Sequence, residues 1–294
     1  MVIMIIILFC NLVRYDTVNP YQKQVYIEGI MGVYRNRIVV KAGTSTLMNE
    51  LGKSDLNNME RLCRVLADIR NRGYELILVS SGAIAFGSGK LGFRKKPDSI
   101  REKQAAAAVG QCSMLNLYDR FFGDYDVTVA QILLSGDDLG LTAKRENLLN
   151  TFETLLGLGV VPVVNENDSV NFSEIESEDH LFGDNDLLSA EVAVLCRAGR
   201  LILLSDTGGL YDRDPRLYPD AKLRSVVERI DEDVFASLGT RGSRRGTDGM
   251  KTKLRAAARA TAAGIETFIV GGKDPEALYR VIRGEPVGTR FIAE

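Results

Sequence analysis

Residues 37–45 read RIVVKAGTS, in which a β-branched apolar run, IVV, is followed by a lysine, an alanine and a glycine. Such a run bounded by small residues is typical of a buried β-strand, and Lys41 would lie at its carboxyl end. From here on, similar short runs alternate with longer stretches of helical spacing, which predicts a parallel sheet covered by helices on both faces. The strands predicted in this way are residues 37–41, 75–80, 127–133, 160–164, 200–205 and 267–270.

Two of the intervening stretches carry apolar residues at the spacing of a helix face, and we expect both faces to belong to the core. Because no repeat or Pro/Gly-rich linker interrupts residues 31–294, this region is predicted to be one domain with two lobes at most. Its most polar stretches, 171–186 and 239–253, are predicted loops at strand ends, where α/β folds bind ligands. The helix faces comprise Leu56, Met59, Leu62, Cys63, Leu66 and Ile69, and then Met250, Leu254, Ala258 and Ala262.

The bulk composition favours a small-molecule partner. The chain has 294 residues with a formal net charge of -2 and a pI near 5.7, so it has no overall positive field to attract nucleic acid. Four widely spaced cysteines and a single histidine, His180, cannot build a zinc cluster. We expect reduced thiols, with Cys63 and Cys196 in the core, a cytoplasmic location and no structural metal.

The first 30 residues stand apart from the rest. Residues 2–10, VIMIIILFC, are continuously apolar, but a spanning helix needs about 20 apolar residues. The run also lacks the basic start and the small-residue cleavage site of a secretory signal. Residues 1–30 are therefore interpreted as a disordered or non-native extension without a membrane role. Translation is hypothesised to start at Met31, and an intact mass of the natural protein that begins earlier would contradict this.

Two small-residue turns follow the first two strands. After Lys41, Gly43 lets the backbone approach an anion, and the next N–H groups can bind phosphate oxygens. No Walker A loop or G-x-G-x-x-G is present there, and a solvated strand end is the alternative interpretation. Ser81 and Gly82 follow the second strand, with hydroxyl and N–H groups that suit a carboxylate or phosphate. A serine pair that caps the next helix explains that turn nearly as well.

Polar clusters follow the later strands. Residues 165–168 (NEND) and 183–186 (GDND) hold like charges that need an ammonium ligand, lysine partners or Mg²⁺ if they lie close together. Two Asx-rich turns are the alternative. The fifth strand ends in SDTGG from Ser205 onward, and residues 246–253 (GTDGMKTK) lead into an alanine-rich helix. Lysines in the first turn of a helix oppose the usual preference for acids, so this helix start is predicted to face phosphate.

Taken in order, these motifs resemble the amino-acid kinase family, and within it most closely the glutamate 5-kinases, which make γ-glutamyl phosphate in proline synthesis. Each motif alone is weak, but six in order at sensible spacing are specific, and they cover residues 35–294. The resemblance implies an open three-layer α/β/α sandwich with a mainly parallel sheet. The N-terminal lobe would bind the amino acid and the C-terminal lobe ATP. The motifs are VVKAGTS, SSGAIA, PVVNENDSV, FGDNDLLSAEVA, LLSDTGGLYDRDPR and GTDGMKTK.

The resemblance also implies a role for each matching residue. Lys41 and Lys253 would contact the phosphates and neutralise the transferring phosphoryl group, and Asp186 would hold both lysines. No strong base is expected, because a carboxylate nucleophile is already ionised at neutral pH. L-Glutamate would be held by Ser81, Gly82, Asp168 and Asn185, with Asp168 on its α-ammonium group. ATP, with Mg²⁺ on its phosphates, would be bound by Lys41, Gly43, Ser205, Asp206, Thr247, Asp248, Gly249, Met250, Lys251, Thr252 and Lys253.

The chain departs from the family pattern at four places. Residues 174–180, EIESEDH, are longer and more acidic than in most bacterial members and resemble the kinase half of the bifunctional pyrroline-carboxylate synthases. Asp248 replaces a common glycine, and Ala42 replaces a bulkier residue. We expect the PUA domain of many members to be absent, so their oligomer architecture is not transferred to this chain, although a homo-oligomer is expected.

Alternative functions stay open at this level. A relative that acts on N-acetylglutamate, aspartate or a nucleoside monophosphate would share the fold. A catalytically weak ATP or amino-acid sensor would be consistent with Asp248 and the acidic residues 174–180. A dinucleotide-dependent oxidoreductase is disfavoured by the missing glycine fingerprint. The resemblance further implies feedback inhibition by proline, the product of the pathway.

Overall fold

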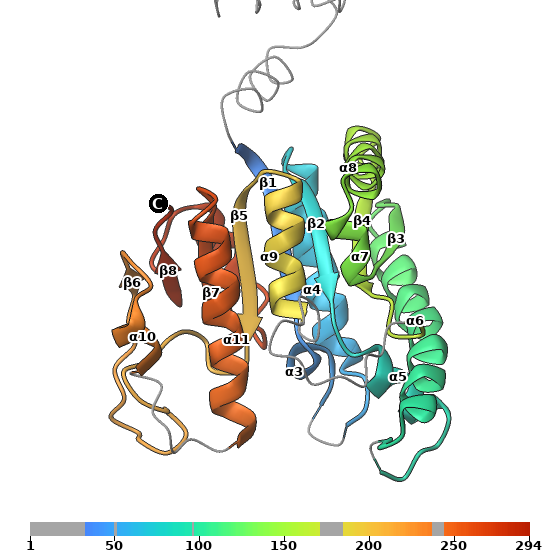
Figure 1. Ribbon diagram of the computed structural model, residues 1–294, viewed down its shortest axis with the longest axis horizontal. Coiled ribbons are helices and arrows are strands. Elements are labelled where there is room, and N and C mark those ends of the chain that lie inside the picture. The colour runs from blue at the N-terminus through green and yellow to red at the C-terminus, as the bar shows by residue number, and fades with distance from the viewer. Residues whose placement is uncertain (1–32, 50–51, 96, 171–184, 237–243) are drawn as a thin grey trace, which may run out of the picture.

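The computed structural model describes residues 33–49, 52–95, 97–170, 185–236 and 244–294, and of residues 244–248 only the backbone. Within this part of the chain, eight strands form one sheet in the order β3-β4-β2-β1-β5-β7-β8-β6 (Figure 1). The pairs are parallel except β7 with β8, which confirms the predicted mainly parallel α/β sheet. The strands are β1 Tyr34–Ala42, β2 Glu75–Ser80, β3 Val129–Leu134, β4 Val161–Glu166, β5 Ala198–Ser205, β6 Val226–Val227, β7 Glu266–Gly271 and β8 Thr289–Phe291.

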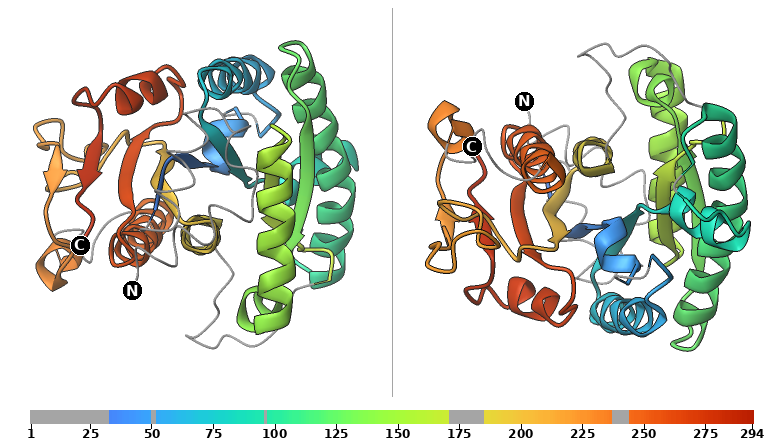
Figure 2. Two further views of the ribbon diagram at one scale, coloured as in Figure 1. Left: turned by 90° about the horizontal axis from the view of Figure 1, so that it is seen from above. Right: turned by 90° about the horizontal axis from the view of Figure 1, so that it is seen from below.

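Helices cover both faces of this sheet, as the two end-on views in Figure 2 show. Helices α8, α9 and α11 pack on one face, and α4, α6 and α12 pack on the other. The result is the expected open three-layer α/β/α sandwich. The described helices are α3 Thr44–Leu47, α4 Leu56–Asn71, α5 Ala83–Lys90, α6 Ile100–Gly123, α7 Gly136–Gly140, α8 Thr142–Gly157, α9 Asn185–Leu195, α10 Glu232–Ala236, α11 Arg244–Thr261 and α12 Ala277–Ile282.

Strand alternation divides the core into two hydrophobic clusters. In β1, Val40 packs in the cluster of α4 and α6, whereas Val39 packs in the cluster of α9 and α11. Because side chains alternate between the two faces of a strand, Lys41 follows Val39 onto the α9 and α11 face. In β5, Ser205 follows Leu203 onto the same face. The alternation therefore places Lys41 and Ser205 on one face, at the carboxyl ends of two neighbouring strands.

The six predicted strands are all present, with small differences at their ends. The sequence does not predict β6 and β8, because two and three residues are too few to show a period. Cys63 and Cys196 are buried as expected, and burial raises the pKa of the Cys196 thiol to about 12.

Two of the predicted core positions are wrong. Leu56 is 51% exposed, and Ala262 is exposed just beyond the end of α11. Both lie at the limits of their helices, away from the middle turns that pack on the sheet. The remaining positions of both faces are buried or half-buried, and the fully buried side chains of α11 are Leu254, Ala256, Ala257 and Ala260.

No described helix combines the length and apolar character needed to cross a membrane. Residues 1–32, with the hypothetical start at Met31, lie outside the described residues. The interpretation of this segment stays a prediction, as does that of residues 174–180, which also lie outside.

Candidate functional site

A buried ion cluster lies where β1, α9 and α11 meet. Asp186, in the first turn of α9, pairs with Lys41 through Oδ1 at 2.6 Å and with Lys253 through Oδ2 at 3.0 Å. Asp186 is only 1% exposed and Lys41 only 5%. Burial alone would raise the pKa of Asp186, but the charges of Lys41 and Lys253 outweigh it and hold this pKa below its ordinary value. Asp186 is therefore ionised at neutral pH, with a lysine on each oxygen.

The charges of this cluster do not balance. Among the described residues, two ammonium groups share one carboxylate, so the cluster has one positive charge in excess. An unbalanced charge away from water is costly unless an anion joins it. The arrangement therefore suits an anionic ligand at the carboxyl edge of the sheet.

Helix α11 joins the cluster through its third turn. Thr252 Oγ1 lies 3.0 Å from Asp186 Oδ2, and Lys253 Nζ also donates to Gly249 O at 3.2 Å. Because α11 begins at Arg244, the loop predicted over 239–253 is wrong for residues 244–253, and Lys251 and Lys253 are not first-turn residues. Two glycines cost the helix about 1 kcal/mol each, but without a proline the backbone hydrogen bonds continue through them.

The residues expected to bind the nucleotide lie along α11 and after β5. Ser205 is buried, and its Oγ accepts a hydrogen bond from Thr207 N at 3.3 Å. Asp206 is exposed and pairs with Arg216 at 3.6 Å. Sequence reasoning names neither Thr207 nor Arg216; the SDTGG motif is a signal for Thr207, but nothing marks Arg216. Gly249, Met250, Lys251 and Thr252 are half-buried, and the side chains of Thr247 and Asp248 lie outside the described residues.

The turn after β2 lies beside the strand of Lys41. Ser81 N donates to Ala42 O at 3.0 Å, which extends the pairing of β1 and β2 by one residue. Gly82 has φ 99°, a conformation that favours glycine. Neither Ser80 nor Ser81 caps α5, because the N-cap residue is Gly82 and no side chain makes a capping hydrogen bond there. The serine-cap alternative is therefore wrong, and Ser80 Oγ is instead 2.9 Å from Tyr118 Oη.

Three polar residues complete this side of the candidate site. Asp168 follows β4 and is half-buried, and burial raises its pKa to about 6. Asn165 Nδ2, at the end of β4, and Asn185 Oδ1, at the start of α9, are buried without a hydrogen-bond partner among the described residues. Buried polar atoms are nearly always paired, so both suit a polar ligand. Sequence reasoning places Asn165 in the NEND cluster but assigns it no role.

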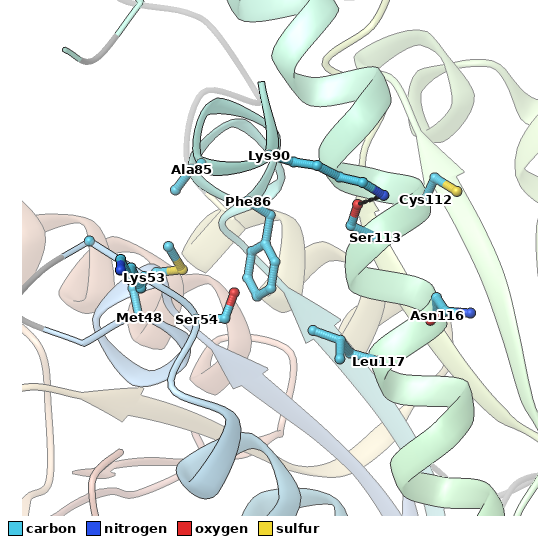
Figure 3. Close-up of a pocket in the computed structure, with 12 residues that line it drawn as sticks. Met48, Lys53, Ser54, Ala85, Phe86, Lys90, Cys112, Ser113, Asn116 and Leu117 are labelled. Carbon is cyan, nitrogen blue, oxygen red and sulfur yellow. Dashed lines mark hydrogen bonds between the residues drawn. The ribbon is translucent and has the colours of Figure 1, made fainter. Parts of the chain in front are cut away.

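A separate cavity of about 660 Å³ lies between Met48, residues 52–54, α5 and α6 (Figure 3). None of the predicted site residues lines it. Phe86, on its wall, lies 3.7 Å from the position that a Cβ at Gly82 would take. The cavity therefore adjoins the back of the Ser81–Gly82 turn, and its two lysines, Lys53 and Lys90, are exposed.

The whole arrangement can be compared with known proteins. Residues 36–271 match the profile of the amino acid kinase family. The chain belongs to this family. This amino acid kinase is 50% identical to the glutamate 5-kinase of Clostridium perfringens over 258 aligned residues. The alignment covers 88% of this chain and 96% of the relative. The chain is 46% identical over 256 residues to the glutamate 5-kinase of Caldanaerobacter subterraneus, with 87% and 68% covered.

Solved structures of two other kinases share the fold. Carbamate kinase from Giardia lamblia bound to AMP-PNP has a TM-score of 0.62 at 14% identity, over 88% of this chain and 99% of that one. An isopentenyl phosphate kinase has a TM-score of 0.58 at 21% identity, over 87% and 99%. At such low identity the likeness concerns the fold alone, and it agrees with the layered architecture described above.

Proposed function

We propose that this amino acid kinase is a glutamate 5-kinase. It transfers the γ-phosphoryl group of ATP to the γ-carboxylate of L-glutamate and forms L-glutamyl 5-phosphate and ADP. The excess positive charge of Lys41 and Lys253 on Asp186 carries this proposal, because a transferring phosphoryl group is an anion that would offset it. The names of the relatives with 43% to 50% identity supply the substrate.

Phosphoryl transfer to a carboxylate needs placement and charge neutralisation rather than a base. A carboxylate oxygen of glutamate forms the new bond to the γ-phosphorus, the bond to the bridging oxygen breaks, and ADP leaves with that electron pair. Lys41 and Lys253 would offset the charge of the phosphoryl group during this step. Asp186 would hold both ammonium groups in place, and its lowered pKa makes it a poor base.

Mg²⁺ fits this site as an ion that the nucleotide carries. Among the described residues no group of three or more His, Cys, Asp or Glu side chains could hold a metal ion, and both oxygens of Asp186 are held by lysines. Mg²⁺ keeps several waters and few protein ligands in kinases. It would offset phosphate charge when bound.

The acid would lie on the β2 and β4 side of the cluster. There the ionised form of Asp168 suits the α-ammonium group of glutamate. Asn165 Nδ2 is a free donor for a carboxylate oxygen, and Asn185 Oδ1 is a free acceptor, among the described residues. Ser81 and Gly82 would line the same side through the turn after β2.

The nucleotide would lie over the C-terminal half of the sheet, between the Gly43 turn, the loop that carries Ser205 and Asp206, and residues 247–253 of α11. We propose that residues 31–294 form the kinase domain. We also propose that the protein is a homo-oligomer and that it is located in the cytoplasm. Proline, as the pathway product, is the proposed feedback inhibitor; unchanged activity at high proline would contradict this.

Trapping of the acyl phosphate tests the proposal directly. The purified chain is incubated with Mg-ATP and hydroxylamine together with glutamate, N-acetylglutamate or aspartate, and hydroxamate and ADP are measured. Hydroxamate with glutamate alone is the expected result. Preference for another acid would move the substrate assignment, and ATP binding without turnover on any acid would favour a sensor.

A further inference from the structure

A one-turn helix behind the ion cluster fixes the position of Gly43. Helix α3 follows Gly43 directly and consists of Thr44–Leu47 alone. A single turn has no stability of its own, so contacts from elsewhere must hold it. Its last two carbonyl groups accept hydrogen bonds from outside the helix, from Asn58 Nδ2 to Thr46 O at 2.8 Å and from Asp55 N to Leu47 O at 2.8 Å. Lys273 Nζ donates to the carbonyl of the C-cap residue, Met48, at 3.3 Å.

Asn58 also supports the segment that follows β7. The same Nδ2 donates to Gly272 O, directly after β7, at 2.9 Å. Gly272 N in turn donates to Ser205 O at 2.8 Å. Asn58 is only 5% exposed, so little water competes for these bonds. One side-chain amide thus connects the turn that carries Gly43 with the loop that carries Ser205.

The two turns joined by Asn58 also touch directly. A Cβ added to Gly272 would lie 2.2 Å from Thr46 Oγ1, so no methyl group fits between them. Thr46 is 1% exposed, and its Oγ1 has no hydrogen-bond partner among the described residues. No Thr46 Oγ1 hydrogen bond among the described residues therefore holds the two turns together: the contact with Gly272 limits how closely they approach, and the two hydrogen bonds of Asn58 hold them at that distance.

We propose that Asn58 is a positioning residue for phosphoryl transfer, because it sets the distance between the Gly43 turn and the Ser205 loop. The inference rests on the proposed kinase function, in which these two segments hold the phosphates of ATP. Displacement of a reacting group by about 1 Å can cost a hundredfold in rate. Asn58 touches neither substrate in this arrangement and acts through the two segments that it joins.

Two substitutions disturb the contact from opposite sides. Asn58→Ala removes both hydrogen bonds, and Gly272→Ala forces the turns apart by steric overlap with Thr46. Both are expected to lower kcat about tenfold to a hundredfold and to raise KM for ATP, with KM for glutamate within about twofold of the wild type. Asn57→Ala is the matched control, because Asn57 is the exposed neighbour on α4. Thermal unfolding is measured for every variant, and rates are measured well below each Tm.

Asn58→Asp should give a pH dependence of kcat that loss of packing alone would not produce. A carboxylate would face two carbonyl oxygens and could donate to neither, whereas the protonated carboxyl can donate to one. Its kcat relative to wild type is expected to rise as the pH falls from 8 to 6. A constant ratio over this range would contradict the proposal.

The outcomes separate this inference from the proposed function. A lower Tm for Asn58→Ala with kcat and KM for ATP unchanged would show a structural contact only and would overturn the proposal, as would a normal rate in Gly272→Ala. If the wild type makes no hydroxamate with any acid, the proposed function fails instead. Asn58 is then tested by the Kd of Mg-ATP from calorimetry without an acceptor: at least tenfold weaker binding in Asn58→Ala supports the positioning role, and an unchanged Kd overturns it.

Discussion

Strand β1 carries a buried cation near each end, and the two cations are paired in opposite ways. At the amino end, Arg37 is 1% exposed and donates to Glu75, to both oxygens of Glu153 and to Cys196 O. At the carboxyl end, Lys41 shares Asp186 with a second lysine. The first cluster has acids in excess and those acids reach water, whereas the second has a cation in excess and is buried. A buried cation whose charge is fully matched by acids typically has a structural role, whereas a buried cluster with unmatched positive charge indicates a site for an anionic ligand.

The largest expected effect is on turnover at the carboxyl end. Lys41→Met and Lys253→Met should each lower kcat about a thousandfold, because the charge they supply is needed mainly in the transition state. Each leaves Asp186 with one lysine, so the fold should persist. Hydroxamate formation and circular dichroism check the two halves of this prediction, and a near-normal rate in either variant would refute its assigned role.

Removal of Asp186, the acid that Lys41 and Lys253 share, should increase the excess positive charge at the carboxyl end of β1. Asp186→Asn leaves the buried Lys41 and the half-buried Lys253 without a carboxylate among the described residues, which should lower the free energy of unfolding by about 3 kcal/mol. Inorganic tripolyphosphate should then raise the Tm of this variant more than that of the wild type. Asp119→Asn, at an exposed carboxylate on α6, is the control. An equal Tm gain in both proteins would argue against excess charge at the cluster.

The amino end should respond in stability alone. Arg37→Met removes a buried guanidinium with all its hydrogen bonds and should lower the free energy of unfolding by about 3 kcal/mol. Because Arg37 lies at the opposite end of β1 from Lys41, kcat per folded molecule should stay within about twofold of the wild type. Urea unfolding and active-site titration measure these quantities, and a large loss of kcat would break the comparison.

The smallest expected effect is a pH dependence on the acid side. Asp168 has a pKa raised by burial to about 6, so it is protonated below that pH and ionised above it. A neutral carboxyl cannot pair with an ammonium group, so kcat/KM for glutamate should fall as the pH drops from 7 to 5, towards tenfold per unit. This range stays above the pKa of the glutamate side chain itself, which is about 4.3. Asp168→Asn should give a lower, flat profile, and a flat wild-type profile would contradict the assignment.

Much of the fold could be predicted because it depends on local period. Short apolar runs mark β1, β2 and β5, and the period of two that buries Val39 also places Lys41 beside α9 and α11. The antiparallel end of the sheet could not be predicted, because β6 and β8, with two and three residues, are too short to show a pattern. The start of α11 was placed too late, since glycine is a weak helix breaker when no proline accompanies it.

The candidate site was predictable only in part. Lys41, Asp186 and Lys253 could be named from ordered motifs, and the geometry brings them together. The link through Asn58 could not be foreseen, because its two acceptors lie 12 and 214 residues away in the chain. A polar residue in the first turn of a helix looks like an ordinary solvated position until tertiary structure buries it.

After a shift in register between Tyr34 and Ile38, strands β1 and β5 pair without interruption up to the carboxyl end that carries Lys41. The Gly43 turn and the Ser205 loop follow these two neighbouring strands, which are in register from Ile38 with Arg200 to Lys41 with Leu203. Neighbouring strands lie about 4.8 Å apart, and separating them would break a row of backbone hydrogen bonds. The backbone pairing therefore limits how far the ends of β1 and β5 can separate, and Asn58 acts on the two turns that extend beyond those ends.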